Sequence, residues 1–207
     1  TDTATTHAGL NLCMDAETTD NVGLQMVLGG SPQGTGSHTF TVGTHSGYID
    51  ATFQAADWTD YDCVVIGFRK TEEFNTSFNG VIATGSSGDL AYTDITAFGI
   101  QGDTNIEIQT DKNNSGTSTS TDCGTTVPVD NQNCRLKVNL SKEGVVTYQI
   151  VVNAVAGSGT LAAPETVASF TFDTSDVLVP YLAILKNGAA VDEIFLKYIK
   201  VYKSFDC

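Results

Sequence analysis

Apolar and polar residues alternate along several short segments of the chain. In residues 48–54 the positions Ile49, Ala51 and Phe53 are apolar, and residues 135–140 repeat the pattern. Successive side chains of a strand point to opposite faces, so a period of two predicts strands with one face in a core and the other in water. The residues predicted to face outward are Tyr48, Asp50 and Thr52 in the first segment, and Arg135, Lys137 and Asn139 in the second.

Two other segments, residues 61–68 and 178–185, are almost continuously apolar. Such runs are typical of central strands that are covered on both faces. Pro180 lacks a backbone N–H, so we expect it at a sheet edge or at the start of a strand. Further strands are predicted near residues 22–28, 38–42, 79–84, 92–101, 104–110, 145–152, 167–172 and 193–203.

The spacing of these segments predicts the fold class. Gly, Asn, Asp and Ser clusters divide the segments, and no long stretch has a 3.6-residue period with caps at both ends. We therefore expect an all-β protein, a two-sheet antiparallel β-sandwich with less than about a tenth of its residues in helix. Residues 10–207 are predicted to form a single sandwich domain that carries a polar insertion at 111–133, and residues 1–9 a flexible arm.

Composition and charge restrict the partners. No apolar run approaches the roughly 18 residues of a membrane span, so membrane insertion is not expected. The 24 acidic residues outnumber the 10 Lys and Arg residues, giving a net charge of −14. This charge repels phosphate backbones, which argues against nucleic-acid binding. Only 16% of the residues are charged, so Thr, Ser, Asn and Gly must supply much of the surface, as in extracellular and virion β proteins.

The five cysteines suggest a disulfide framework. Cys123 and Cys134 enclose a polar loop with few large apolar residues, and a bridge between them would pin that loop. Cys13 and Cys207 lie near the two ends, which often pair in antiparallel sandwiches, so a second bridge between them is a further hypothesis. The alternative is that all five residues are free thiols in a reducing compartment.

The common catalytic and metal-binding motifs are missing from the sequence. It contains no G-x-S-x-G segment and no Gly-rich segment followed by Lys-Ser or Lys-Thr. His7, His38 and His45 have no cysteine at zinc-finger spacing. We therefore predict no catalytic residue, no metal and no cofactor.

A short acidic and aromatic cluster is the one candidate for ligand binding. Trp58 and Tyr61 could stack on a sugar ring, and Asp57 and Asp60 could bond its hydroxyl groups. The alternative is a polar turn in which Trp58 caps the core.

Two parts of the chain resemble known families. The segment VLVPYLAILKNGAAVDEIFLKYIKVYKS, residues 177–204, resembles the closing strands of concanavalin-like and laminarinase-like jelly rolls. The segment HSGYIDATFQAADWTDYDCVVIGFRKTEEF, residues 45–74, and the hairpin RLKVNLSKEGVVTYQIVVNA, residues 135–154, resemble domains of bacteriophage virion proteins. Together the resemblance spans most of residues 38–203.

Where the laminarinase-like enzymes carry Glu-x-Asp-x-x-Glu, this chain has Asn105, Glu107 and Thr110. Glycoside hydrolysis needs two carboxylates, so this resemblance does not imply an enzyme. Lys197 stands where that family commonly has a calcium-binding Asp of the last strand, and an ammonium group repels calcium.

The resemblance to virion proteins implies a non-enzymatic structural or decoration protein of a tailed phage on the virion surface. Its expected partners are other virion proteins, further copies of itself in a homo-oligomer, and host-surface glycans. The alternative is a secreted or cell-surface carbohydrate-binding module.

Overall fold

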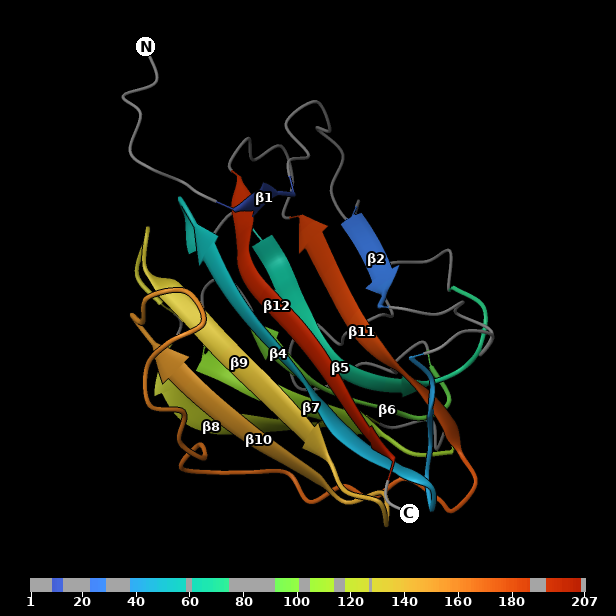
Figure 1. Ribbon diagram of the computed structural model, residues 1–207. Helices are drawn as coiled ribbons and strands as arrows, with labels where there is room; N and C mark the ends of the chain where they lie inside the picture. The colour runs from blue at the N-terminus through green and yellow to red at the C-terminus, as the bar shows by residue number, and fades with distance from the viewer. Residues whose placement is uncertain are drawn as a thin grey trace.

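The computed structural model describes residues 9–12, 23–28, 38–58, 61–74, 92–100, 105–113, 118–126, 128–186 and 193–205. Within these ranges the chain forms two layers of antiparallel strands and no α-helix (Figure 1). The strands are β1 (Leu10–Asn11), β2 (Gly23–Val27), β3 (Phe40–Thr41), β4 (His45–Ala55), β5 (Tyr61–Lys70), β6 (Ile95–Ile100), β7 (Asn105–Asp111), β8 (Thr119–Thr126), β9 (Asn133–Leu140), β10 (Val146–Val152), β11 (Val177–Lys186) and β12 (Ile194–Phe205).

The strands are divided between a five-stranded and a seven-stranded sheet. The first has the order β1-β12-β4-β9-β10, and the second has the order β2-β11-β5-β6-β7-β8, with the short β3 also paired to β11. The first and last described strands, β1 and β12, pair with each other. The predicted two-sheet antiparallel sandwich is therefore confirmed.

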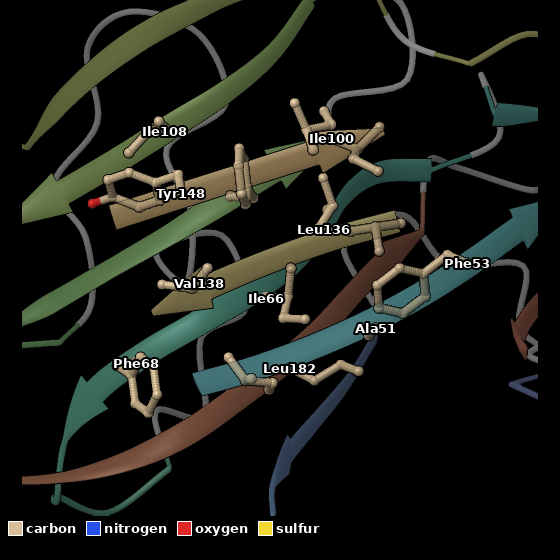
Figure 2. Close-up of a cluster of buried hydrophobic side chains, with 14 of the residues drawn as sticks. Ala51, Phe53, Ile66, Phe68, Ile100, Ile108, Leu136, Val138, Tyr148 and Leu182 are labelled. Carbon is tan, nitrogen blue, oxygen red and sulfur yellow. The ribbon is translucent and has the colours of Figure 1, made fainter. Parts of the chain in front are cut away.

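The main core lies between the two sheets. Every second residue of the strands that line it points inward and contributes to it. Phe53 of β4 and Leu136 of β9 face Ile66 of β5 and Leu182 of β11 across the interface (Figure 2). Neighbouring strands of one sheet keep this alternation in register, since Ala51 pairs directly with Leu136. The prediction of a half-buried strand is thus confirmed for residues 135–140. In residues 48–54 the side chains alternate as predicted, but the outward-facing Asp50 and Thr52 are also buried, because the loop after β10 contacts this part of the sheet.

The continuous apolar runs belong to β5 and β11, which lie side by side inside the seven-stranded sheet. Their inward residues, such as Ile66 and Leu182, join the main core. Their outward residues include Val65, Tyr181 and Leu185, which form a second buried cluster on the other face of the sheet. Both faces are covered, as the sequence pattern predicted.

Pro180 lies at the fourth position of β11 and not at its start, which corrects our expectation. On the side away from β5, two short strands pair with β11. Strand β3 pairs with residues 177 and 178, and β2 pairs only from Tyr181 onward. The Pro180 carbonyl accepts a bond from the backbone N–H of Leu28, so the proline nitrogen also faces that side. The missing N–H falls in the gap between the two short strands, where no ladder bond is lost.

The segment 111–133 is more ordered than the polar insertion that we predicted. Strand β8 runs through it and pairs with β7 at the edge of the seven-stranded sheet. Threonine favours strands because its branched side chain suits a pleated surface, and the polarity of the segment concealed this tendency. A bulge at Cys123 and Gly124 interrupts the pairing, and Gly124 has a φ of 70°, which suits glycine.

Two other expectations have different outcomes. Residues 167–172 form no regular strand and make only an isolated bridge, between Thr171 and Val145. The predicted strand at 79–84 lies outside the described residues, as does the predicted arm except for Gly9. In the part of the chain that is described, no helix is long and apolar enough to cross a membrane.

The proposed bridge between Cys123 and Cys134 is absent, because both residues are buried free thiols. Cys123 belongs to β8 of the seven-stranded sheet and Cys134 to β9 of the five-stranded sheet. Stacked sheets lie about 10 Å apart, whereas a disulfide needs Cα atoms within roughly 7 Å. The segment is held instead by strand pairing. Cys13 and Cys207 lie outside the described residues, so the second bridge stays a hypothesis.

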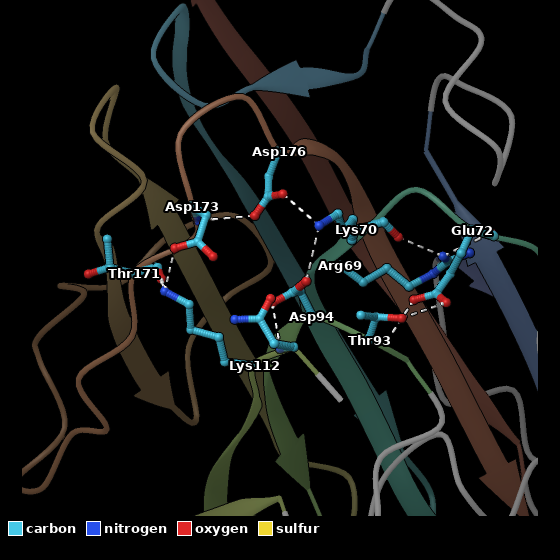
Figure 3. Close-up of polar contacts among 10 residues, drawn as sticks. Arg69, Lys70, Glu72, Thr93, Asp94, Lys112, Thr171, Asp173 and Asp176 are labelled. Carbon is cyan, nitrogen blue, oxygen red and sulfur yellow. Dashed lines mark hydrogen bonds and ion pairs between the residues drawn. The ribbon is translucent and has the colours of Figure 1, made fainter. Parts of the chain in front are cut away.

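A network of charged residues ties the edge of the core to the loops. Lys70, at the end of β5, contacts buried Asp94 at 3.3 Å and Asp176 at 2.7 Å (Figure 3). Asp176 accepts the backbone N–H of Asp173, and Asp173 pairs with Lys112 at 2.7 Å. The hydrogen bond with Asp176 raises the pKa of Lys70. These contacts join the turn before β11 to the ends of β5 and β7.

Replacing Phe53 with Ala tests the central core. The ring is fully buried, so its loss should lower the free energy of unfolding by about 3–5 kcal/mol. Val155→Ala is a matched control, because Val155 is 75% exposed and its replacement should change stability by less than about 0.5 kcal/mol. Urea unfolding followed by fluorescence measures both. Equal effects would contradict the placement of Phe53 in the core.

Differential alkylation tests the free thiols. Protein isolated without reductant is labelled with light iodoacetamide, then unfolded and labelled with the heavy reagent. Burial raises the pKa of Cys123 to about 12 and also raises that of Cys134, so neither should react in the native state. We expect peptides with Cys123 and Cys134 to carry only the heavy label. Peptides that carry no label until reductant is added would show a disulfide.

Candidate functional site

The predicted sugar-binding cluster does not form an aromatic platform. Trp58 is only 1% exposed and belongs to the main core, so its ring cannot stack on a ligand. Its backbone N–H donates to the Asp130 carboxylate at 3.4 Å. The structure corrects the prediction in favour of the alternative, a turn in which Trp58 caps the core. Asp57 is half-buried beside it, whereas Asp60 and the Tyr61 side chain lie outside the described residues.

The positions of the laminarinase-like motif lie on two different faces of β7. Asn105 and Glu107 point to the outer face of the seven-stranded sheet. Thr110 has the opposite parity and pairs with Thr96, whose hydroxyl contacts Tyr148 in the core. Even a carboxylate at position 110 would therefore point away from Glu107. This strand does not supply the facing pair of carboxylates that glycoside hydrolysis requires.

The outer face of the five-stranded sheet carries an unusual set of residues for an acidic chain. Strand pairing places the outward positions of β12, β4 and β9 in rows. One row is Tyr202, Tyr48 and Asn139, the next is Lys200, Asp50 and Lys137, and the third is Tyr198, Thr52 and Arg135. We call these nine residues the cationic face.

Two tyrosines stack at one end of the cationic face, in its first row. The rings of Tyr48 and Tyr202 have centroids 5.3 Å apart and planes inclined by 24°. Tyr202 is 48% exposed, so one side of the stack faces solvent. The ammonium groups of Lys137 and Lys200 lie 4.1 Å and 5.5 Å from the Tyr48 centroid, at cation–π distance.

One ion pair neutralises the single acidic residue of the cationic face. The Arg135 guanidinium donates two hydrogen bonds to the Asp50 carboxylate, at 2.9 Å and 2.7 Å. Arg135 also donates to the Ser158 carbonyl, which holds the loop after β10 against the sheet. The hydrogen bond with Asp50 raises the pKa of Arg135, and the opposite charges of the ion pair cancel each other. Lys137 and Lys200 then leave the face with a net positive charge.

Lys197, which stands where the laminarinase-like family commonly has a calcium-binding Asp, lies at the border of the cationic face. Lys197 is the extra residue at an irregularity in the pairing of β12 with β4. Its ammonium group donates to the Gln54 side chain at 3.0 Å, and burial lowers its pKa. No group of three or more His, Cys, Asp or Glu side chains suited to a metal ion occurs among the described residues. The absence of calcium at this strand stays a prediction.

The sequence alone identified part of the cationic face. The alternation in residues 48–54 and 135–140 identified six of its members as outward-facing, among them Tyr48 and Lys137. It could not show that β12 pairs with β4 in the register that places Tyr202 beside Tyr48. That register depends on contacts between segments about 150 residues apart.

No family model and no curated protein matches this sequence. Solved structures match the fold. The exoplasmic/lumenal domain of VIP36, determined with Ca²⁺ and Man3GlcNAc bound, is 10% identical with a TM-score of 0.53, covering 90% of this chain and 75% of that chain. A seed lectin of Lotus tetragonolobus is 13% identical with a TM-score of 0.50, covering 90% and 84% of the two chains. An alginate lyase of Pseudomonas aeruginosa is 10% identical with a TM-score of 0.46, covering 82% and 70%.

These comparisons show architecture and not activity, because one fold serves many functions. The chain has the concanavalin-like sandwich of two antiparallel sheets that is found in lectin domains.

Proposed function

We propose that this chain is a non-enzymatic carbohydrate-binding module and that it binds acidic glycans through the cationic face. The observation that carries the proposal is the partly exposed stack of Tyr202 on Tyr48, beside the two lysines of the adjacent row. The lectin-like fold is consistent with it.

The stacked tyrosines suit the apolar face of a sugar ring. A tyrosine offers a rigid aromatic surface and a polar hydroxyl group, so it can cover sugar C–H groups and bond a sugar hydroxyl. Asn139 lies in the same row as the stack, and its side chain bonds Gln149 of β10 at 3.4 Å. These amides provide donors and acceptors beside the aromatic surface.

The lysines favour a negatively charged glycan. The whole chain carries a net charge of −14, which repels acidic polymers from most of its surface. Lys137 and Lys200 flank β4 on opposite sides, so two strand spacings of about 4.8 Å separate them. A short acidic oligosaccharide could place one anionic group near each lysine. A hydrogen bond with the Tyr48 hydroxyl raises the pKa of Lys200, which keeps it charged.

The cationic face does not offer the pair of carboxylates that hydrolytic cleavage uses. Its only carboxylate belongs to Asp50, which is 3% exposed and doubly bonded to Arg135. Hydrolysis of a glycosidic bond uses an acid and a second carboxylate. The face therefore lacks the two groups that would attack and protonate a bound sugar.

A virion location is a second, compatible proposal. It is supported by the resemblance of residues 45–74 and 135–154 to virion proteins, and a virion-surface protein could present the cationic face to host glycans. In that setting the partners would be other virion proteins and further copies of this chain. Co-purification with particles, detected by antibody, would support this location, and recovery only in the secreted fraction would support the alternative.

Binding of defined oligosaccharides tests the proposed function. Calorimetric titration with an oligogalacturonate should show saturable binding, whereas a neutral dextran oligomer should bind at least tenfold more weakly. Tyr202→Ala and the double variant K137A/K200A should each weaken oligogalacturonate binding about tenfold, the equivalent of about 1.4 kcal/mol. Raising salt should weaken wild-type binding, since exposed charges are screened.

Lys142→Ala is the matched control, because Lys142 lies in the turn between β9 and β10, away from the rows of the cationic face. It should bind like the wild type. Equal loss in this control would show a general charge effect. If the oligogalacturonate does not bind, and an array of acidic and neutral glycans is also negative, the proposed function is wrong.

A further inference from the structure

A buried arginine lies on the opposite side of the molecule, on the outer face of the seven-stranded sheet. Arg69 of β5 is paired with Val179 of β11 and Ile95 of β6. Its side chain points away from the main core, toward the second buried cluster, and is 0% exposed. Burial lowers its pKa. Because an arginine guanidinium still remains protonated, this is a fully buried positive charge.

Three aromatic rings surround the guanidinium carbon. The ring centroids lie at 4.2 Å for Tyr92, 5.3 Å for Tyr181 and 5.4 Å for Phe74. The hydroxyl groups of both tyrosines donate to the same side-chain oxygen of Gln25, which fixes the two rings. The rings offset part of the charge through cation–π attraction.

Three of the five N–H donors of the Arg69 guanidinium have no partner among the described residues. Its Nη1 donates to the carbonyls of Lys70 at 2.9 Å and Glu72 at 3.1 Å (Figure 3). Its Nε and Nη2 are buried and have no hydrogen-bond partner among the described residues. The Glu72 carboxylate does not reach them, because it accepts the backbone N–H and the hydroxyl of Thr93.

The two unused groups lie on one edge of the guanidinium. Nε–H and Nη2–H point the same way in the plane of the group, and this fork matches the two oxygens of a carboxylate. Aromatic rings act on the face of the guanidinium and leave donors in its plane unsatisfied. Buried polar groups normally have partners, so this orphaned pair of donors calls for an explanation, and its shape fits the two oxygens of a carboxylate.

We propose that Arg69 is a binding site for a carboxylate group, which the Nε and Nη2 groups hold through two parallel hydrogen bonds. The ligand is a small carboxylic acid or a larger molecule that presents one carboxylate. Its negative charge compensates the guanidinium, and its two coplanar oxygens accept from Nε–H and one N–H of Nη2, which are two of the three orphaned donors. This site does not depend on the cationic face or on the proposed glycan binding.

The sequence makes the site directly observable, since the chain contains only two arginines, Arg69 and Arg135. In a ¹H–¹⁵N spectrum the guanidinium Nε–H groups should give two signals. The variant Arg135→Lys removes one signal and so assigns the other to Arg69. Arg135 is an internal control, because its Nε already donates to Asp50.

Acetate and acetamide are matched probes, since they share a shape and differ in charge. With chloride used to hold the ionic strength constant, acetate should shift the Arg69 signal saturably and leave the Arg135 signal in place. Acetamide should have no effect. Arg69→Lys, which keeps the charge but loses the fork, should weaken acetate binding at least tenfold, as measured by the acetate-dependent rise in melting temperature. Arg135→Lys should keep the full response of Arg69.

The proposal is overturned if the Arg69 signal does not move with acetate, if it moves equally with acetamide, or if it shifts without saturation. The wild-type and Arg135→Lys spectra decide the question even if the Arg69→Lys variant fails to fold.

Discussion

The burial of β5 and β11 on both faces is the constraint on which the rest of the structure depends. These strands pair along almost their whole length at the centre of the seven-stranded sheet. One face closes the main core against β4 and β9, and the other carries the second buried cluster. Apolar burial is the main favourable contribution to folding. Strands that bury side chains on both faces remove more apolar surface from water than strands with one face in solvent. The outer strands are placed by their register relative to this pair.

The two sheets differ in what their outer faces present. The outer face of the five-stranded sheet carries polar, aromatic and basic residues, of which Tyr202 and Lys200 are exposed and Asp50 and Thr52 are buried. The seven-stranded sheet buries its outer face around Arg69, Tyr92 and Tyr181. Burying a charge away from water is expensive, so the buried guanidinium of Arg69 is unusual. The two proposed sites follow from this difference, one open to a polymer and the other suited to a single group.

Several features were predictable from local patterns, and their limits are physical. Period-two alternation led to the sandwich because it reports which side chains share a face. The same reasoning missed β8, since threonine-rich strands read as polar loops. It also misplaced the disulfide, because spacing along the chain does not show that Cys123 and Cys134 belong to different sheets. The sequence left two interpretations of Trp58 open, stacking on a ligand or capping the core, and burial decided for the core.

The sequence by itself determined the all-β sandwich, the central position of the two apolar runs, and the outward direction of Tyr48, Lys137 and their alternating neighbours. These follow from hydrophobic period and backbone chemistry, which act over a few residues. Tertiary structure alone decided that Tyr202 stacks on Tyr48 and that three aromatic rings surround Arg69. Those contacts join segments distant in the chain, and strand register, which local propensity does not specify, sets their geometry.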